Sequence, residues 1–138
     1  MRIATWNLES VRPKSSEREQ AFRQAMQEVN ADIWVLTETW IDFGPGDGFE
    51  LVAQSSEAQD LTAHPNRCWV SIWARSSFNR IPMEPCVQPD RLARGRLQVA
   101  GQPDIVVVGT VLPWLSDGLF PGANGFCETL SIQEAAWT

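Results

Sequence analysis

The sequence predicts an α/β fold. An apolar, strand-like run over residues 2–8 is followed by a helical pattern over residues 16–30 and by a second apolar run over residues 33–37. This order is typical of a unit in which two parallel strands are joined by a helix. A chain of 138 residues that is 43% hydrophobic is long enough for one domain with a buried core.

The predicted helix has both a start signal and an apolar face. Ser15 or Ser16 can cap it, and Glu19 lies three residues after Ser16, which completes a capping box. Five apolar residues recur at helical spacing and predict one buried face: Ala21, Phe22, Ala25, Met26 and Val29.

The rest of the chain predicts further strands and one more helix. Residues 43–48 form a turn-rich loop that lacks the Gly-Lys-Ser/Thr of a phosphate cradle, and residues 49–54 read as a short strand. Residues 55–66 are polar and irregular, and a strand is expected over 68–74. Residues 94–100 and 104–111 predict a hairpin across Gly101-Gln102-Pro103, and 126–137 a helix. No repeat or linker divides the chain, which indicates a single unit.

Charge and cysteine content argue against several classes of protein. A formal net charge of −6 disfavours a general nucleic-acid binder. Six of the eleven basic residues nevertheless fall within residues 67–96, either as a local anion-binding face or as scattered, solvated arginines: Arg67, Arg75, Arg80, Arg91, Arg94 and Arg96. Three widely spaced cysteines and one histidine disfavour a zinc site or a disulfide framework. No signal peptide or membrane span is visible, so the expected location is the cytoplasm.

Asn7 and Glu38 each end an apolar strand, and both carry a hard oxygen ligand. Strand ends are where α/β folds commonly place reactive groups. If the two strands are neighbours, an amide oxygen and a carboxylate converge on a shared Mg²⁺, a cation that binds few carboxylates and keeps waters. Alternatively, Asn7 is a turn former and Glu38 a solvated strand-end charge.

The amino-acid sequences of four segments resemble the endonuclease/exonuclease/phosphatase superfamily. They are Arg2-Ile-Ala-Thr-Trp-Asn-Leu8, Ala31-Asp-Ile-Trp-Val-Leu-Thr-Glu-Thr39, Trp69-Val-Ser-Ile-Trp-Ala-Arg75 and Asp104-Ile-Val-Val-Val-Gly-Thr-Val-Leu-Pro113. In that family a Trp-Asn pair ends the first strand and a Gln/Thr-Glu-Thr run ends the second. The resemblance implies the N-terminal half of a two-sheet α/β sandwich, with a mixed sheet and flanking helices.

For activity, the resemblance implies a magnesium-dependent hydrolase of phosphodiester or phosphomonoester bonds, with Mn²⁺ as an alternative metal. Glu38 is then the metal ligand and Asn7 binds the metal or the scissile phosphate, while Arg75 is a candidate for the substrate phosphate. Substrates in this superfamily are DNA, RNA, inositol phosphates and sphingolipids, so nucleic acid is one candidate. The rival interpretation is a non-catalytic α/β binding module.

The sequence also departs from the family pattern. Val111 replaces the tyrosine before proline, and Trp114 is a candidate to fill part of its volume. The Gly-Asp-x-Asn and Ser-Asp-His segments that supply the base and the remaining groups have no match, and His64 lies too early and reads as a surface residue. Residues 1–138 are therefore expected to be a partial, inactive domain whose partner is the missing C-terminal half.

A lone half domain is expected to leave an apolar sheet face exposed, since each half of the family domain is expected to supply one sheet. Ile72, Val106 and Val108 are the candidates for that face. The expected consequence is poor solubility or self-association of the 138-residue chain.

Overall fold

The structure, a computed structural model, describes residues 1–9, 16–56, 66–84 and 91–111. These residues form one helix and seven strands, in the order β1 (Ile3–Asn7), α1 (Ser16–Val29), β2 (Ile33–Trp40), β3 (Phe49–Gln54), β4 (Arg67–Arg75), β5 (Asn79–Ile81), β6 (Leu92–Gln98) and β7 (Ile105–Thr110). The α/β class is confirmed. The expected helix over 126–137 and residues His64, Cys86, Trp114 and Cys127 lie outside the described residues.

The larger sheet has four strands in the order β1-β2-β4-β3. β1 and β2 run parallel, with Ile3 opposite Ile33 and Asn7 opposite Thr37, which confirms the predicted strand–helix–strand unit. β4 runs antiparallel to both β2 and β3, so the sheet is mixed.

The second sheet is antiparallel, in the order β5-β6-β7. β6 and β7 form the predicted hairpin, with Leu97 opposite Ile105. β5 was not predicted, because its sequence, Asn-Arg-Ile, is too short to show the apolar alternation of a strand.

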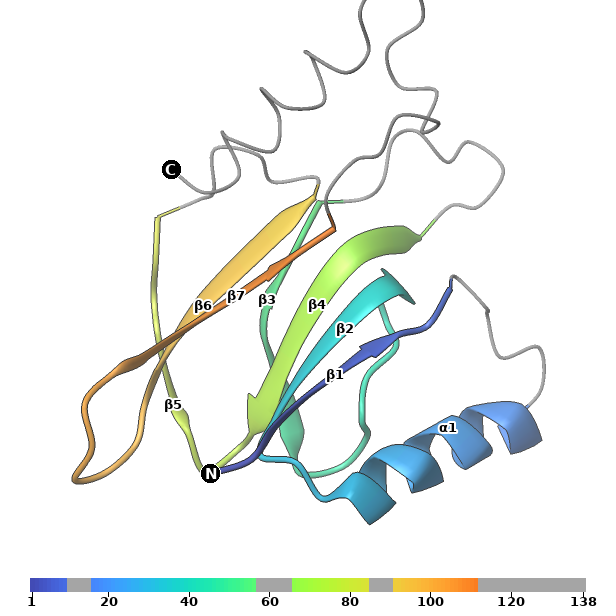
Figure 1. Cartoon of the computed structure of the whole chain (residues 1–138), viewed down its shortest axis with the longest axis horizontal. Helices are drawn as coiled ribbons and strands as arrows, with labels where there is room; N and C mark the ends of the chain where they lie inside the picture. Colours follow the sequence, from blue (N-terminus) through green and yellow to red (C-terminus); the bar gives the residue numbers. More distant parts are fainter. Residues whose placement is uncertain (10–15, 57–65, 85–90, 112–138) are drawn as a thin grey trace, which may run out of the picture.

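The two sheets pack face to face around one apolar core (Figure 1). Val70 and Ile72 of β4 are fully buried there, together with Leu97 of β6. Gly109 of β7 allows the close approach, because a Cβ at this position would lie 2.6 Å from Val70 Cγ1. The expectation that this chain supplies only one sheet, with Ile72 exposed, is therefore wrong: the second sheet already covers Ile72.

Val106 and Val108 are exposed, by 54% and 49%, as expected. They alternate along β7 with Val107 and Gly109, which are buried, so they lie on the face of β7 directed away from the core.

α1 lies on the other face of the four-stranded sheet (Figure 1). Met26 is buried there with Trp34 and Leu36, and the Phe22 ring meets the Trp6 ring edge-on at 5.4 Å. The predicted face is narrower than expected, since Ala21 and Val29 are exposed. The reason is geometric: a helix touches a sheet along a narrow stripe, and these two residues lie beside it.

β1 is the edge of the larger sheet, and its residues alternate. Ala4 and Trp6 pack toward α1, whereas Ile3, Thr5 and Asn7 are exposed on the face that looks toward the second sheet. Among the described strands, β7 reaches over β2 and β4 but makes no comparable contact with β1. Asn7 therefore lies at an open border of the sandwich.

Candidate active site

Asn7 and Glu38 come together as the sequence predicted. β1 and β2 are parallel neighbours, so their carboxyl ends meet at the same edge of the sheet. Asn7 Nδ2 donates a hydrogen bond of 3.1 Å to Glu38 Oε1. The contact joins residues 31 positions apart, and only the parallel pairing of the strands brings them together.

The Asn7 amide is oriented by its own loop. Asn7 Oδ1 accepts a hydrogen bond of 2.9 Å from the backbone N–H of Glu9, two residues on, which is an Asx turn. Glu9 takes a left-handed conformation, with φ of 49°. Glu9 was not among the predicted site residues, although an Asn side chain that can accept from the backbone two residues on is the sequence signal for such a turn. The turn directs the nitrogen of the amide at Glu38.

Glu38 interrupts the regular geometry of β2. Its φ is 49°, in the left-handed region that costs a non-glycine residue roughly 1–2 kcal/mol. In the described pairing of β2 with β4, Thr37 pairs with Val70 and Thr39 with Cys68, while Glu38 takes no position in the register. Backbone strain of this kind is concentrated at functional sites, where surrounding structure maintains it.

The donor set at this pair suits a cation that keeps much of its own water. Glu38 Oε1 accepts from Asn7, while Oε2 accepts no hydrogen bond from a described residue and is open to a ligand. Mg²⁺ is commonly bound through one or two carboxylates plus water and substrate phosphate, which fits one open carboxylate oxygen. Within the described part of the chain, no group of three His, Cys, Asp or Glu side chains gathers around a common point. These residues therefore fit part of a magnesium site.

Arg75 lies at the other end of the sheet. Its Nε donates to Asp32 Oδ1 at 3.2 Å, and its guanidinium lies 5.1 Å from the centroid of the Phe49 ring. Asp32 precedes β2 and Glu38 is six residues further on, about 20 Å away at roughly 3.3 Å per residue of strand. The structure therefore does not bring Arg75 to the Asn7–Glu38 pair.

The other arginines of residues 67–96 do not form a single anion-binding face. Arg80 pairs with Glu50 at 2.9 Å and Arg96 with Asp104 at 2.6 Å. Arg67 and Arg91 are buried, and both guanidiniums lie against the Trp69 ring. Arg80 and Arg96 agree with the interpretation that these arginines are scattered and solvated. Arg67 and Arg91 do not, because both are buried in the core.

Val111, which the sequence resemblance places at a family tyrosine, packs against the core between the sheets. Its backbone N–H donates to the carbonyl oxygen of Arg91 at 3.1 Å. An apolar side chain suits that position, because it contributes to the core and offers no hydroxyl to a phosphate.

Comparison with known proteins identifies the fold. The TRAS1 endonuclease domain, from a telomere-specific non-LTR retrotransposon, superposes with a TM-score of 0.55 at 16% identity, over 94% of this chain and 52% of that one. Humanized D. rerio TDP2 gives 0.54 at 15%, over 77% and 44%. ANGEL2, a 2′,3′-cyclic phosphatase, gives 0.51 at 17%, over 70% and 31%. All are endonuclease/exonuclease/phosphatase superfamily members. This chain has the endonuclease/exonuclease/phosphatase fold.

The match to this fold is structural and partial. No protein-family model and no curated protein sequence matches the chain. The chain spans about half the length of the TRAS1 domain, and less of the other two proteins. In the part of the chain that the structure describes, no helix has the length and apolar character needed to cross a membrane.

Proposed function

We propose that the complete domain to which these residues belong is a magnesium-dependent hydrolase of phosphodiester or phosphomonoester bonds. The observation that carries the proposal is the Asn7–Glu38 pair, in which an amide donates to one oxygen of a carboxylate and leaves the other without a hydrogen bond from a described residue. The fold adds support, since its structural neighbours include an endonuclease domain and a cyclic phosphatase.

Glu38 is the proposed metal ligand, through Oε2. Mg²⁺, or Mn²⁺ in its place, would supply positive charge that neutralises a bound phosphate. Asn7 would keep the carboxylate in one orientation through the 3.1 Å hydrogen bond, and the second lone pair of its Oδ1 remains open toward metal or phosphate. Nucleic acid is the proposed substrate class, because the structural neighbours include an endonuclease domain.

The described residues supply no base to activate water. Apart from Asn7, none of them bonds to the Glu38 carboxylate. We therefore expect the base to come from residues that complete the domain, and we propose the rest of that domain as the partner of the open border. Because removing one member of a catalytic unit can cost as much as removing them all, we expect residues 1–138 alone to show little activity.

The test is hydrolysis of bis(p-nitrophenyl) phosphate and p-nitrophenyl phosphate by protein made from the complete reading frame. We expect activity with Mg²⁺ or Mn²⁺, loss of activity in EDTA, and a fall in kcat/KM of at least about 100-fold for Glu38→Gln. Glu28→Gln, an exposed carboxylate on α1, is the matched control and should behave as wild type. Activity that survives both EDTA and Glu38→Gln would rule out the metal assignment.

A second measurement separates metal binding from catalysis. Mn²⁺ added to the 138-residue chain should broaden the NMR signals of amides near Asn7 and Glu38, and Glu38→Gln should abolish this effect. Broadening without any hydrolysis by the complete protein would favour the alternative, a non-catalytic α/β binding module.

A further inference from the structure

A cavity of about 500 Å³ lies at the opposite border of the sandwich from Asn7. It is formed by β3, β6 and the segment that runs from β5 to Glu84. β3 is the edge of the larger sheet farthest from β1, so this cavity is separate from the Asn7–Glu38 pair. Its volume falls in the range of small-molecule binding sites.

The walls of the cavity combine polar and apolar side chains, and the polar lining includes Gln54 and Glu84. Val52 and Ala53 of β3 line one side, and Met83 and Leu92 line another. Gly95 of β6 fits closely against Val52, and a Cβ at Gly95 would collide with Val52 Cγ1. The contact holds β3 and β6 at a set separation, so the cavity exists before any ligand binds.

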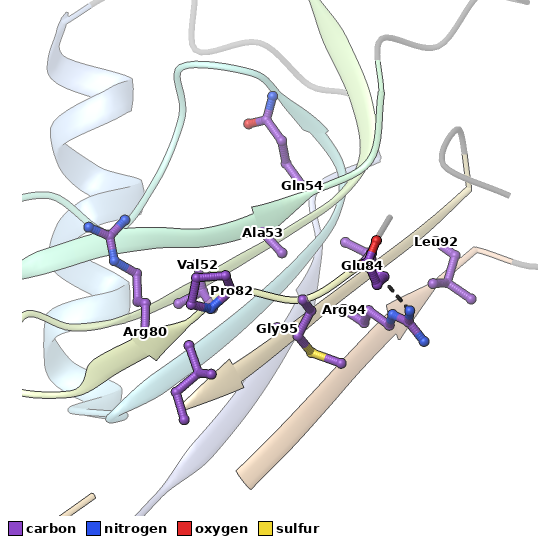
Figure 2. A pocket seen from close by; sticks show the side chains of 12 residues that line it. Val52, Ala53, Gln54, Arg80, Pro82, Glu84, Leu92, Arg94 and Gly95 are labelled. Atoms are coloured by element: carbon purple, nitrogen blue, oxygen red, sulfur yellow. Dashed lines mark hydrogen bonds between the residues drawn. The ribbon is translucent and has the colours of Figure 1, made fainter. Parts of the chain in front are cut away.

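Arg80 and Arg94 lie toward opposite ends of the cavity, with Val52 and Pro82 between them (Figure 2). Arg80 donates from Nη1 to the carbonyl oxygen of Leu51 at 2.8 Å and pairs with Glu50 at 2.9 Å. The charge of Arg80 is therefore balanced by a carboxylate.

Arg94 differs from Arg80 in its partners. Its Nη2 donates to the backbone carbonyl oxygen of Glu84 at 3.0 Å, and its Nε is enclosed without a hydrogen-bond acceptor (Figure 2). Among the described residues, no carboxylate pairs with Arg94. A partly buried cation is unfavourable without an anion, and an enclosed donor that is left unpaired loses the hydrogen bond it would make in water.

We propose that this cavity binds a small organic anion, whose carboxylate or phosphate pairs with Arg94 while a short apolar body packs against Val52 and Met83. An oxyanion beside Arg94 balances the guanidinium charge, and a slight turn of the guanidinium lets Nε donate to it. The apolar body gains by leaving water. The inference does not depend on the proposed hydrolase activity.

The test is an NMR titration of the 138-residue chain with four six-carbon probes: hexanoate, hexyl phosphate, 1-hexanol and hexylammonium. Hexanoate or hexyl phosphate should shift the amide signals of Ala53, Arg94 and Gly95, with affinity about tenfold above 1-hexanol, which corresponds to one charge-assisted contact. Hexylammonium should not bind. The tighter of the two anions identifies the oxyanion, and either order supports the site.

Arg94→Gln and Arg96→Gln form the matched pair of variants. Arg96 is two residues along β6 on the same face, but it pairs with Asp104 and does not line the cavity. Arg94→Gln should remove the preference for an anion over 1-hexanol, and Arg96→Gln should retain it. If Arg94→Gln does not fold, the order of affinities of the four probes for the wild-type chain decides whether the cavity prefers an anion. Equal binding of all probes, shifts elsewhere in the chain, or no shifts would overturn the proposal.

Discussion

The side-chain amide of Asn7 holds Glu38 through its nitrogen. Nδ2 donates to Glu38 Oε1 at 3.1 Å, whereas Oδ1 is directed to the backbone N–H of Glu9 at 2.9 Å. The amide therefore fixes the orientation of the Glu38 carboxylate, and this orientation sets the position of Glu38 Oε2.

Asn7→Ala should weaken metal binding without removing the ligand itself. Loss of a residue that orients a ligand typically reduces metal affinity about 10–100-fold. Thr5→Ala, on the same exposed row of β1, is the control and should keep wild-type affinity. NMR line broadening by added Mn²⁺ measures the metal affinity of both variants. Equal affinities would mean that Asn7 does not position Glu38.

Glu38→Gly should be more stable than Glu38→Ala, although both lose the carboxylate. Glycine tolerates the left-handed φ of 49°, so it removes roughly 1–2 kcal/mol of backbone strain that alanine retains. Urea denaturation measures the difference. At Thr37, which has no positive φ, the order should be reversed, so that Thr37→Gly is less stable than Thr37→Ala.

Gly109→Ala should destabilise the contact between the sheets. The added Cβ would lie 2.6 Å from Val70 Cγ1 and 2.8 Å from Val35 Cγ1, and overpacking of this kind costs about 1–3 kcal/mol. Val108→Ala, on the exposed face of the same strand, should change the free energy of unfolding by less than about 0.5 kcal/mol. Thermal unfolding of the two variants in parallel tests whether Gly109 lies in close contact with the facing sheet.

Asp32→Asn should change how the free energy of unfolding depends on pH in acidic solution. The backbone N–H of Arg2 and the Arg75 guanidinium lower the pKa of Asp32 below its ordinary value of 3.8. Because the folded-state pKa is the lower one, the stabilisation is complete above 3.8 and is lost as pH falls from there through the folded-state pKa.

The size of the Asp32 effect is expected to be modest, about 1 kcal/mol at neutral pH, since water partly screens the side chain. Asp42→Asn, an exposed residue of the loop after β2, is the control. A variant Asp32→Asn as stable as wild type at neutral pH would contradict the role of this carboxylate.

Cys68 should resist alkylation in the folded chain. Its thiol is buried, and desolvation raises its pKa to about 12, so almost no thiolate is present at pH 8. Iodoacetamide labelling followed by peptide mass spectrometry should show little modification at Cys68 until urea unfolds the protein. Rapid labelling under native conditions would show that β4 opens locally.

Local patterns were enough to place β1, α1 and β2, although β2 continues to Trp40, beyond the predicted end at Thr37. Apolar periodicity belongs to residues close in sequence, so the parallel unit and the β6–β7 hairpin follow from it directly. Asn7 and Glu38 were found in the same way, since each ends an apolar run. β5 carries too few residues for any period to appear.

The order of the elements, the resemblance to a fold family and the two polar residues that end apolar runs all follow from the sequence alone. Three outcomes required the folded structure. Ile72 is buried, and Arg75 pairs with Asp32, 43 residues away. Glu38 has a left-handed backbone conformation and accepts a hydrogen bond from Asn7. These outcomes depend on contacts between distant segments, and such contacts arise only when the two sheets pack together.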